Sequence, residues 1–203
     1  MLDPIIENHR KYCERINYYK NFGYNIEKER SFILEKSYPI YGDILEVGTG
    51  KGYFSVELAK EGYSFTSIDI SEQEQGLAKL NVKYFGFENN IDFKIENAEH
   101  LSFDDSSFDI IFSINTIHHL GNPIQAIDEL ARIVTLEGKI ILADFTKEGL
   151  EIINKVHKRE HREHETNQTN LAYIEKYLLK KDFNIKKYES KCQEVLIACH
   201  PIV

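Results

Sequence analysis

The chain has 203 residues, with 25 Lys and Arg against 33 Asp and Glu, and its formal net charge is −8. This length suits one well-buried α/β domain, and no internal repeat or flexible linker divides it. The negative charge offers no general attraction to a polyanion, so we expect no nucleic-acid partner. Cys13, Cys192 and Cys199 are scattered without CxxC spacing, which argues against a disulfide framework or a thiolate metal site.

The N-terminus carries no basic segment followed by an apolar one, and no run of 18 apolar residues occurs in the chain. We therefore expect a cytoplasmic protein without a membrane partner. The sequence does not distinguish a monomer from a homodimer.

Residues 1–36 are rich in charge and tyrosine, and apolar side chains three or four apart predict two short amphipathic helices separated by Gly23. Tyr12, Tyr18, Tyr19 and Tyr24 lie in this segment. These tyrosines could simply pack the helices onto a sheet. We favour the interpretation that the two helices form a lid over a ligand site.

Residues 40–145 alternate between strand and helix patterns. Strands are predicted at residues 43–47, 64–69, 91–95, 108–115 and 139–144, and helices at residues 53–61, before Gly86, and from Pro123 to just before Gly138. The almost continuously apolar residues 108–115 are typical of a central parallel strand, whereas residues 91–95 alternate as an edge strand does. The predicted buried side of the second helix holds Leu77, Leu80 and Tyr84, and that of the third includes Val134.

Residues 147–168 form a charged, histidine-rich insertion, and residues 170–203 predict a closing helix followed by strands at 183–189 and 194–199. Too few residues separate these two strands for a crossover helix, so they must pair antiparallel. The whole pattern predicts an α/β fold with a doubly wound, mostly parallel sheet. Its ligand should bind outside the carboxyl ends of the central strands.

A glycine loop follows the first predicted strand, with Gly48, Gly50 and Gly52 at alternate positions. Such a loop lets backbone approach a ligand closely. It is not a phosphate-binding P-loop, because Leu45 and Gly52 occupy the places of that motif's first Gly and its Ser/Thr. Tyr53 stands where a dinucleotide loop has its last Gly or Ala, which disfavours a nicotinamide dehydrogenase.

Glu46 suits a ligand with an ammonium group better than one with a pyrophosphate. The segment E-V-G-T-G-K-G at residues 46–52 resembles the first motif of the class I, Rossmann-like S-adenosylmethionine-dependent methyltransferases, in particular their small-molecule, type 11-like branch. The resemblance spans roughly residues 40–145 in motif order and extends to the closing strands. It implies a single methyltransferase domain over residues 1–203, with a seven-stranded sheet in the order 3-2-1-4-5-7-6, strand 7 antiparallel, and an N-terminal helical lid.

The resemblance also implies S-adenosyl-L-methionine as cofactor and S-adenosyl-L-homocysteine as product. The methionine part would be held by Glu46 and by Gly48, Thr49, Gly50 and Gly52 of the loop. Asn115, which ends the fourth strand, would lie beside the sulfonium and amino groups.

For the nucleoside, Asp69 follows Gly48 by 21 residues (69 − 48), the spacing at which an acidic residue reaches a ribose in related folds. Ile70 would pack on adenine, and Asn97, Ala98 and Glu99 resemble the segment that meets it. The family usually has Asp in place of Asn97, whose carbonyl can still accept a hydrogen bond from the adenine amino group.

On the acceptor side, Asn115 to Leu120 resemble a histidine-containing segment of small-molecule methyltransferases, and Thr116 and Ile117 replace the prolines of nucleic-acid amino methyltransferases. His118 or His119 has a pKa range suited to removing a proton from an acceptor, although one of them could instead pack beneath the loop. The predicted function is direct in-line methyl transfer to a small molecule. The alternative is a non-catalytic regulatory module that binds the cofactor or its product.

His157, His161 and His164 fall on one face if the insertion is helical, a spacing able to present three imidazoles to one metal. The same segment alternates Glu with Arg and Lys, as solvated helix faces do. We therefore predict a solvated face or lid, with contact to the acceptor as another possibility, and no metal; these three histidines are the candidates for one.

Overall fold

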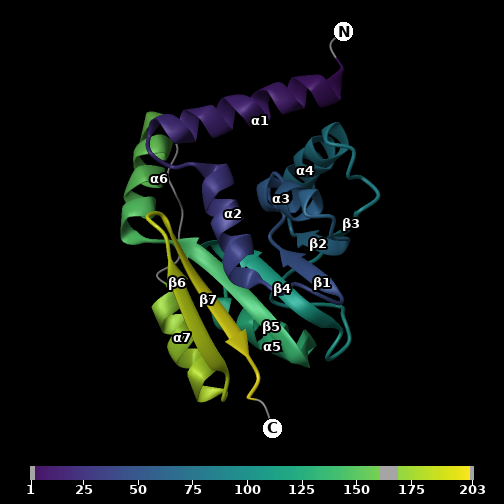
Figure 1. Ribbon diagram of the computed structural model, residues 1–203, viewed down its shortest axis with the longest axis vertical. Coiled ribbons are helices and arrows are strands. Elements are labelled where there is room, and N and C mark those ends of the chain that lie inside the picture. The colour runs from purple at the N-terminus through teal and green to yellow at the C-terminus, as the bar shows by residue number, and fades with distance from the viewer. Residues whose placement is uncertain (1–2, 161–168, 202–203) are drawn as a thin grey trace.

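The computed structural model describes residues 3–160 and 169–201, and its centre is a sheet of parallel and antiparallel strands (Figure 1). The strands are β1 (Ile44–Val47), β2 (Phe65–Asp69), β3 (Ile91–Ile95), β4 (Phe108–Ile114), β5 (Val134–Phe145), β6 (Asn184–Glu189) and β7 (Gln193–Cys199). They form one seven-stranded sheet in the order β3-β2-β1-β4-β5-β7-β6. Strand β7 pairs antiparallel with β5 and β6, and the other neighbours are parallel. The predicted fold and strand order are confirmed.

Most of the helices begin just after a polar residue that caps them; the helix that follows Gly52 has no capping side chain. They are α1 (Pro4–Asn21), α2 (Ile26–Ser37), α3 (Tyr53–Lys60), α4 (Glu72–Tyr84), α5 (Pro123–Ile133), α6 (Lys147–Arg159) and α7 (Leu171–Lys180), with a 3-10 turn η1 at Ile117–His119. The side chains of Asn25, Ser71, Asn122 and Thr146 each accept a backbone N–H of the helix that follows. Of these helices, none is both long and apolar enough to cross a membrane.

The buried strands contribute alternate side chains to apolar clusters on the two faces of the sheet. On β4, Ile111 belongs to one cluster, whereas Ile110 and Phe112 belong to the other. Helices α5 and α7 pack on the first face, and α2, α3 and α4 supply residues to the second. Burial on both faces explains the nearly continuous apolar sequence of this strand.

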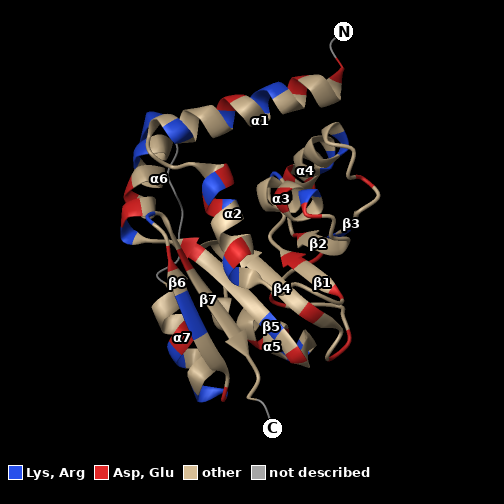
Figure 2. Cartoon of the chain, in the orientation of Figure 1, with Lys and Arg blue, Asp and Glu red and all other residues tan. Residues whose placement is uncertain are grey.

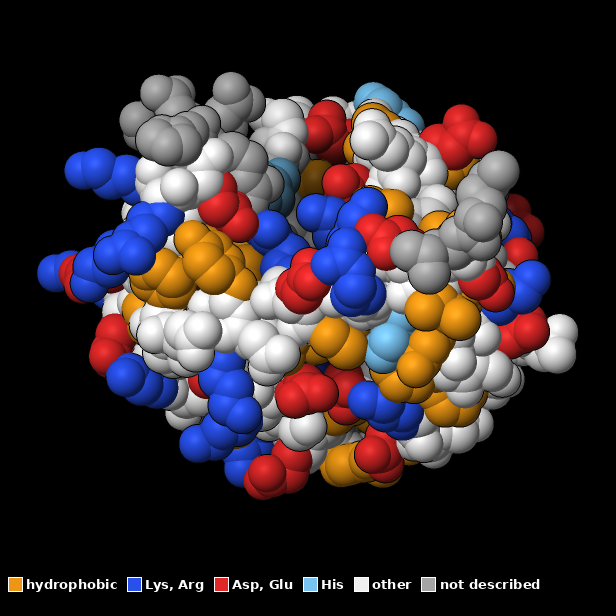
Figure 3. Space-filling model, turned by 90° about the horizontal axis from the view of Figure 1, so that it is seen from above, with side chains coloured by type: hydrophobic (Ala, Val, Ile, Leu, Met, Phe, Trp, Pro, Cys, Tyr) orange, Lys and Arg blue, Asp and Glu red, His pale blue; other side chains and the backbone are white. Residues whose placement is uncertain are grey.

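A third apolar cluster joins the N-terminal helices to α6. It contains Tyr12, Ile16 and Tyr19 of α1 together with Ile152, Ile153 and Val156 of α6. Helix α1 crosses the top of the molecule in Figure 1, above the carboxyl ends of the central strands, and both it and α6 carry charges of both signs (Figure 2). Seen from above, this side presents hydrophobic and histidine side chains among charged ones (Figure 3). With 18 residues, α1 is longer than predicted.

The predicted buried side of α4 is wrong. This helix buries Gln75, Ala78, Asn81 and Val82, while Tyr84 is 44% exposed. Buried amides are tolerated because they bond to backbone: Gln75 donates to the Lys94 carbonyl at 2.9 Å, and Asn81 donates to the Lys51 carbonyl at 2.9 Å. Asn81 thereby ties α4 to the glycine loop.

The predicted boundary between the third core helix and its strand is also displaced. Val134 does not extend α5; it is extended and begins β5, where it pairs with Phe108. A register shift then lies between Phe108 and Ile110. An irregular strand entry of this kind leaves no period-2 pattern in the sequence.

Candidate functional site

The glycine loop between β1 and α3 has a backbone that other residues adopt only with strain. Gly48, Gly50 and Gly52 have φ values of 87°, 50° and 77°, in the left-handed region that favours glycine. A Cβ added to Gly48 would lie 2.1 Å from Thr116 Oγ1, and one at Gly52 would lie 2.9 Å from the Ala78 Cβ. At Gly50 a Cβ would meet nothing within 4 Å. The loop therefore packs closely against Thr116, just before η1, and against α4, whereas its tip at Gly50 is open.

A cavity of about 740 Å³ lies at the carboxyl ends of the central strands, within the usual range of cofactor sites. It brings together most residues predicted to bind the cofactor: Glu46, Gly48, Thr49, Gly50, Asp69, Ile70, Asn97, Ala98, Glu99 and Asn115. Gly52 packs on α4 instead. We call this space the cofactor cavity.

Glu46 is a buried carboxylate in the wall of the cofactor cavity, only 2% exposed. Its Oε2 accepts hydrogen bonds from Ser55 Oγ and Ser67 Oγ, both at 2.6 Å. Burial raises the pKa of Glu46 to about 7, against the opposing effect of the two serines and of nearby Arg30. A positively charged ligand group beside it would favour the ionised form.

Asp69 shapes the loop that it faces. Its Oδ2 accepts the Gly50 N–H at 2.7 Å, and its Oδ1 accepts the Ser71 N–H at 2.8 Å. An ionised carboxylate offers about four acceptor sites, so hydroxyl groups of a ligand can bind the same oxygens.

Side chains of the segment predicted to meet adenine hold its backbone in place through hydrogen bonds. Asn97 Oδ1 accepts the Glu99 N–H at 3.0 Å, and Glu99 Oε1 accepts the Asn122 N–H at 2.8 Å. Ala98 is buried, whereas Ile70 is 70% exposed. An apolar wall and an exposed apolar side chain on the same cavity suit a flat ring.

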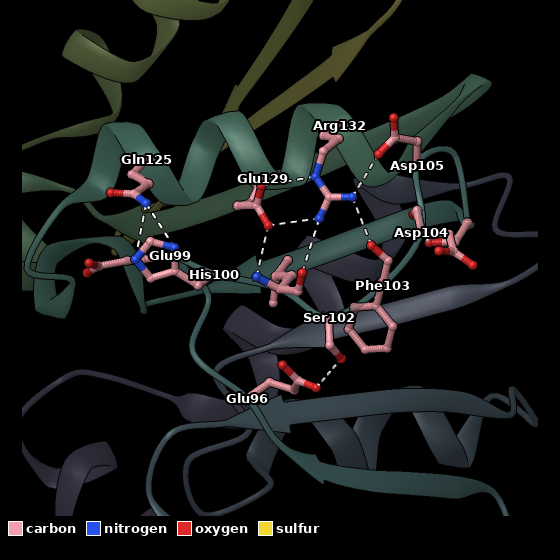
Figure 4. A network of polar contacts seen from close by, with 12 residues as sticks. Glu96, Glu99, His100, Ser102, Phe103, Asp104, Asp105, Gln125, Glu129 and Arg132 are labelled. Atoms are coloured by element: carbon pink, nitrogen blue, oxygen red, sulfur yellow. Dashed lines mark hydrogen bonds and ion pairs between the residues drawn. The ribbon is translucent and has the colours of Figure 1, made fainter.

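Arg132 of α5 anchors the chain that follows this segment (Figure 4). Its guanidinium donates to the carbonyls of Leu101 at 3.2 Å and Phe103 at 2.8 Å and also binds Asp105 and Glu129. Glu129 in turn accepts the Leu101 N–H at 2.8 Å. This network has a positioning role, because it holds one wall of the cofactor cavity to a helix of the core.

Arg30 of α2 also lines the cofactor cavity, and the sequence interpretation missed it. Its side chain is buried, and Nη1 and Nη2 donate to the Asn115 carboxamide oxygen at 3.2 and 3.0 Å when that amide is oriented to satisfy its neighbours. Its Nε has no hydrogen-bond partner, and no carboxylate of the described residues forms an ion pair with it. A buried cation in this state is stabilised by an anionic ligand group.

His118 of η1 is paired with Asp144 at the end of β5. Its Nδ1 lies 2.7 and 2.9 Å from the two carboxylate oxygens, and both side chains are largely buried. A carboxylate that accepts from Nδ1–H holds the neutral ring in the tautomer with its lone pair on Nε2. Of the two predicted histidines, His118 therefore has the oriented ring, while His119 lines the cofactor cavity. Asp144 was not among the predicted site residues.

A smaller cavity of about 180 Å³ adjoins the cofactor cavity, and both His118 and His119 line it. The two cavities share Arg30, Tyr53, Asn115, His119 and His157 as lining residues. The rest of the smaller cavity is mostly aromatic and apolar: Tyr19, Tyr24, Ile26, Phe145 and Ile153. A ligand in one cavity is thus next to a ligand in the other.

The predicted histidine trio is described only in part. His157 lies on α6, and its Nε2 is 3.4 Å from Tyr19 Oη. His161 and His164 fall outside the residues that the structure describes. Within residues 3–160 and 169–201, no group of three or more His, Cys, Asp or Glu side chains could hold a metal ion.

Comparison with known proteins identifies this arrangement. Residues 45–142, which contain the glycine loop, Asp69 and Asn115, match the methyltransferase domain family. The chain belongs to the class I S-adenosylmethionine-dependent methyltransferases. S-adenosylmethionine is therefore its cofactor.

The relatives of this class I methyltransferase match the chain over only part of their own length. Methyltransferase GfsG of Streptomyces halstedii is 31% identical over 107 residues, which are 52% of this chain and 38% of that protein. A ubiquinone biosynthesis O-methyltransferase of Dechloromonas aromatica is 30% identical over 105 residues, 51% of this chain and 44% of that protein. The alignments thus span less than half of each relative. The solved structure of a SAM-dependent methyltransferase from Aquifex aeolicus has the same fold, with a TM-score of 0.65 at 20% identity over 83% of this chain and 88% of that one.

The residues present fit S-adenosylmethionine. Its amino-acid end carries an ammonium and a carboxylate, and the cofactor cavity has buried Glu46 and buried Arg30 in its wall. Asp69 offers acceptors to ribose hydroxyls, and Ile70 offers apolar surface to the base. Opposite charges placed on one cavity wall suit a zwitterion better than a pyrophosphate.

Proposed function

We propose that this class I methyltransferase transfers a methyl group to a small-molecule acceptor. The observation that carries the proposal is the shared wall of the two cavities, because Tyr53, Asn115 and His119 line both. An acceptor in the smaller cavity would lie beside a cofactor in the larger one. The names of the curated relatives, which include ubiquinone biosynthesis O-methyltransferases, support a small-molecule acceptor.

Glu46 and Arg30 would hold the amino-acid end of the cofactor, Asp69 its ribose, and Ile70 with the Asn97 segment its base. Bound S-adenosylmethionine supplies an electrophilic methyl carbon. The chain then has to orient the acceptor in line with that carbon and exclude water, which lowers the barrier through proximity. The lining residues that the two cavities share, among them Tyr53 and Asn115, support this role.

His118 would act as the general base, with Asp144 as the residue that orients it. A neutral imidazole with its lone pair held on Nε2 can take a proton from an O–H or N–H group. The tyrosines of the smaller cavity are poor bases, since burial raises the pKa of Tyr53 to about 12 and also raises that of Tyr24. A non-catalytic regulatory module has no use for an oriented histidine, so this pair favours an enzyme.

The N-terminal segment, residues 1–36, would serve as a lid that closes both cavities. Arg15 of α1 makes an ion pair with Glu160 after α6 at 3.0 Å, and Tyr12 stacks on Tyr53 with ring centroids 4.8 Å apart. Arg15→Gln should accelerate amide exchange in α1, whereas Arg10→Gln on the exposed face should not. Equal exchange in the two variants would argue for a fixed helix rather than a lid.

Calorimetry with S-adenosylhomocysteine tests the proposed function at the cofactor. We expect the wild type to bind and Asp69→Ala to weaken binding by about tenfold or more. Asp92→Ala, on the exposed edge strand β3, is the matched control and should bind as the wild type does. Undetectable binding to the wild type would remove the proposal.

A further inference from the structure

A groove runs along α1, outside the two cavities described above. It measures about 580 Å³ and lies where α1 packs across α4 (Figure 1). The residues of α1 that line it extend from Asn8 to Tyr18, which corresponds to about 15 Å of helix. Leu77 and Asn81 line it from α4. We call this space the α1 groove.

The α1 groove adjoins both cavities at Tyr53, which lines all three spaces. It also shares Lys51 with the cofactor cavity and Arg15 with the smaller cavity. The smaller cavity measures about 180 Å³, and an apolar cavity of about 150 Å³ already holds a single benzene ring. An acceptor larger than one ring would therefore extend past Tyr53 into the α1 groove.

Aromatic rings form much of the wall of the α1 groove. Tyr12 stacks on Tyr53 with ring centroids 4.8 Å apart and an interplanar angle of 22°, and Tyr18 and Leu77 add further apolar surface. Among residues 3–160 and 169–201, the hydroxyl groups of Tyr12, Tyr18 and Tyr53 form no hydrogen bond. Such tyrosines suit a guest with an apolar body that also carries oxygen acceptors.

Two lysines give the α1 groove a positive charge that a ligand can use. The acids that line it, Glu14 and Glu160, are each hydrogen-bonded to an arginine of α1. Lys11 and Lys51 instead lie 3.7 and 3.6 Å from the carboxylate oxygens with which they pair, beyond the usual length of a hydrogen bond. Since long, partly exposed ion pairs contribute little, both ammonium groups can turn to an anionic group of a guest.

We propose that the α1 groove binds the non-reacting part of the methyl acceptor, and that this part is an apolar segment carrying a carboxylate or a similar oxyanion. The inference rests on the proposed function and adds a second region of contact with the acceptor. The apolar segment would lie on the tyrosine rings, and Lys11 and Lys51 would bind the oxyanion. Binding energy gained away from the reacting atom would help to hold the acceptor in line with the methyl carbon.

A pair of fluorescent probes tests this inference without turnover. Anilinonaphthalene sulfonate is an apolar anion, and phenylnaphthylamine is its counterpart without the sulfonate; the fluorescence of both rises in apolar sites. With the protein saturated with S-adenosylhomocysteine, we expect both probes to bind. Lys11→Glu should weaken binding of the sulfonate alone by about fivefold or more, because the reversed charge replaces an attraction by a repulsion. Lys20→Glu, on α1 outside the groove, makes the same change in net charge and should bind both probes as the wild type does.

A second pair of variants tests the apolar part of the site. Leu77→Gln removes apolar surface from the α1 groove and should weaken binding of both probes by about threefold or more. Leu80→Gln is the matched control, since Leu80 is also a half-buried leucine of α4 but does not line the groove. It should leave the binding of both probes unchanged.

Turnover then connects the α1 groove to the acceptor. From a panel of small-molecule acceptors, a carboxylate-bearing compound is compared with its own methyl ester, which lacks the charge. Lys11→Glu should raise KM for the carboxylate and leave KM for the ester unchanged. An equal change for the two compounds would separate the groove from the acceptor.

The outcomes distinguish this inference from the proposed function. Loss of S-adenosylhomocysteine binding in the wild type would contradict the proposed function itself. Normal S-adenosylhomocysteine binding with an equal effect of Lys11→Glu on the two probes, or with no effect on either, would overturn the inference alone. The same conclusion would follow if Lys20→Glu weakened sulfonate binding as much as Lys11→Glu does.

Discussion

Asp144 holds His118 in a fixed orientation, with both of its carboxylate oxygens within 2.9 Å of Nδ1. The two residues come from different elements, since Asp144 ends β5 and His118 lies in the turn after β4. Parallel strands that end at the same edge of the sheet bring them together. His118 lines the smaller cavity, in which an acceptor would lie beside the cofactor.

Asp144→Asn should lower the rate of methyl transfer by about tenfold or more without changing S-adenosylhomocysteine binding. An amide can present its N–H to Nδ1 and so favour the tautomer with the proton on Nε2, which is no longer a base. The release of S-adenosylhomocysteine during turnover with a panel of small-molecule acceptors measures the effect. Asp128→Asn on the outer side of α5 is the control; equal rates in the two variants would contradict the positioning role of Asp144.

Gly48→Ala should destabilise the protein by about 1–3 kcal/mol and weaken cofactor binding. The residue has a φ of 87°, and the added methyl would overlap the Thr116 side chain. Gly76→Ala is a matched control on α4, where a Cβ meets nothing within 4 Å and Ala favours the helix by about 0.5–1 kcal/mol. The thermal unfolding temperatures of the two variants should shift in opposite directions. If Gly48→Ala changed neither the stability nor cofactor binding, the loop would have to relieve the overlap by relaxing elsewhere.

Cofactor affinity should depend on pH through Glu46. Burial raises its pKa from 4.5 to about 7, so in the free protein the carboxyl group holds a proton below about pH 7. The ammonium group of a bound ligand would favour the ionised carboxylate instead. Binding then releases a proton, and S-adenosylhomocysteine affinity should rise by up to about tenfold per pH unit until about pH 7 and level off above. Glu46→Gln should bind more weakly and show no such rise; an unchanged pH profile would separate Glu46 from the ligand.

The same raised pKa has a consequence for folding. Between pH 4.5 and about 7, the unfolded chain has released the Glu46 proton while the folded protein retains it. The contribution of Glu46 to the free energy of unfolding therefore decreases as pH rises through this window, and it is most favourable below pH 4.5. In Glu46→Gln this contribution should be absent, which denaturant unfolding at pH 5 and pH 7.5 can measure.

Arg30 should distinguish ligands that have the amino-acid carboxylate from those that lack it. Arg30→Gln removes the buried charge, and S-adenosylhomocysteine binding should weaken by about tenfold to a hundredfold, as expected for a charged hydrogen bond. Adenosine, which has no carboxylate, should bind both proteins alike. Asp69→Asn provides the matched contrast, since it should weaken both ligands. Equal losses of the two ligands in Arg30→Gln would indicate a structural role for Arg30.

The sequence predicts most of the sheet because the signals are local. The apolar run of β4 indicates burial on both faces, and the alternation of β3 indicates an edge strand. The short link before β7 indicates that it pairs antiparallel with β6. The glycine loop can also be predicted from the sequence, since the left-handed backbone at Gly48 favours glycine. These features depend on period and spacing, which one sequence contains.

What the sequence does not reveal depends on which way a side chain turns in the folded protein. Arg30 looks like any charged helix residue until α2 packs its side chain against Asn115. Gln75 and Asn81 are buried because carbonyls of distant segments accept their amides. Asp144 did carry a signal, an acidic residue at the end of a strand beside β4, and the rule for ligand sites in open sheets marks such positions.

A crystal structure of the protein with S-adenosylhomocysteine tests the central claim most directly. The account predicts the amino-acid end between Glu46 and Arg30, the ribose on Asp69, and the sulfur facing the smaller cavity lined by His118. A ligand bound elsewhere, or a sulfur walled off from the smaller cavity, would contradict it.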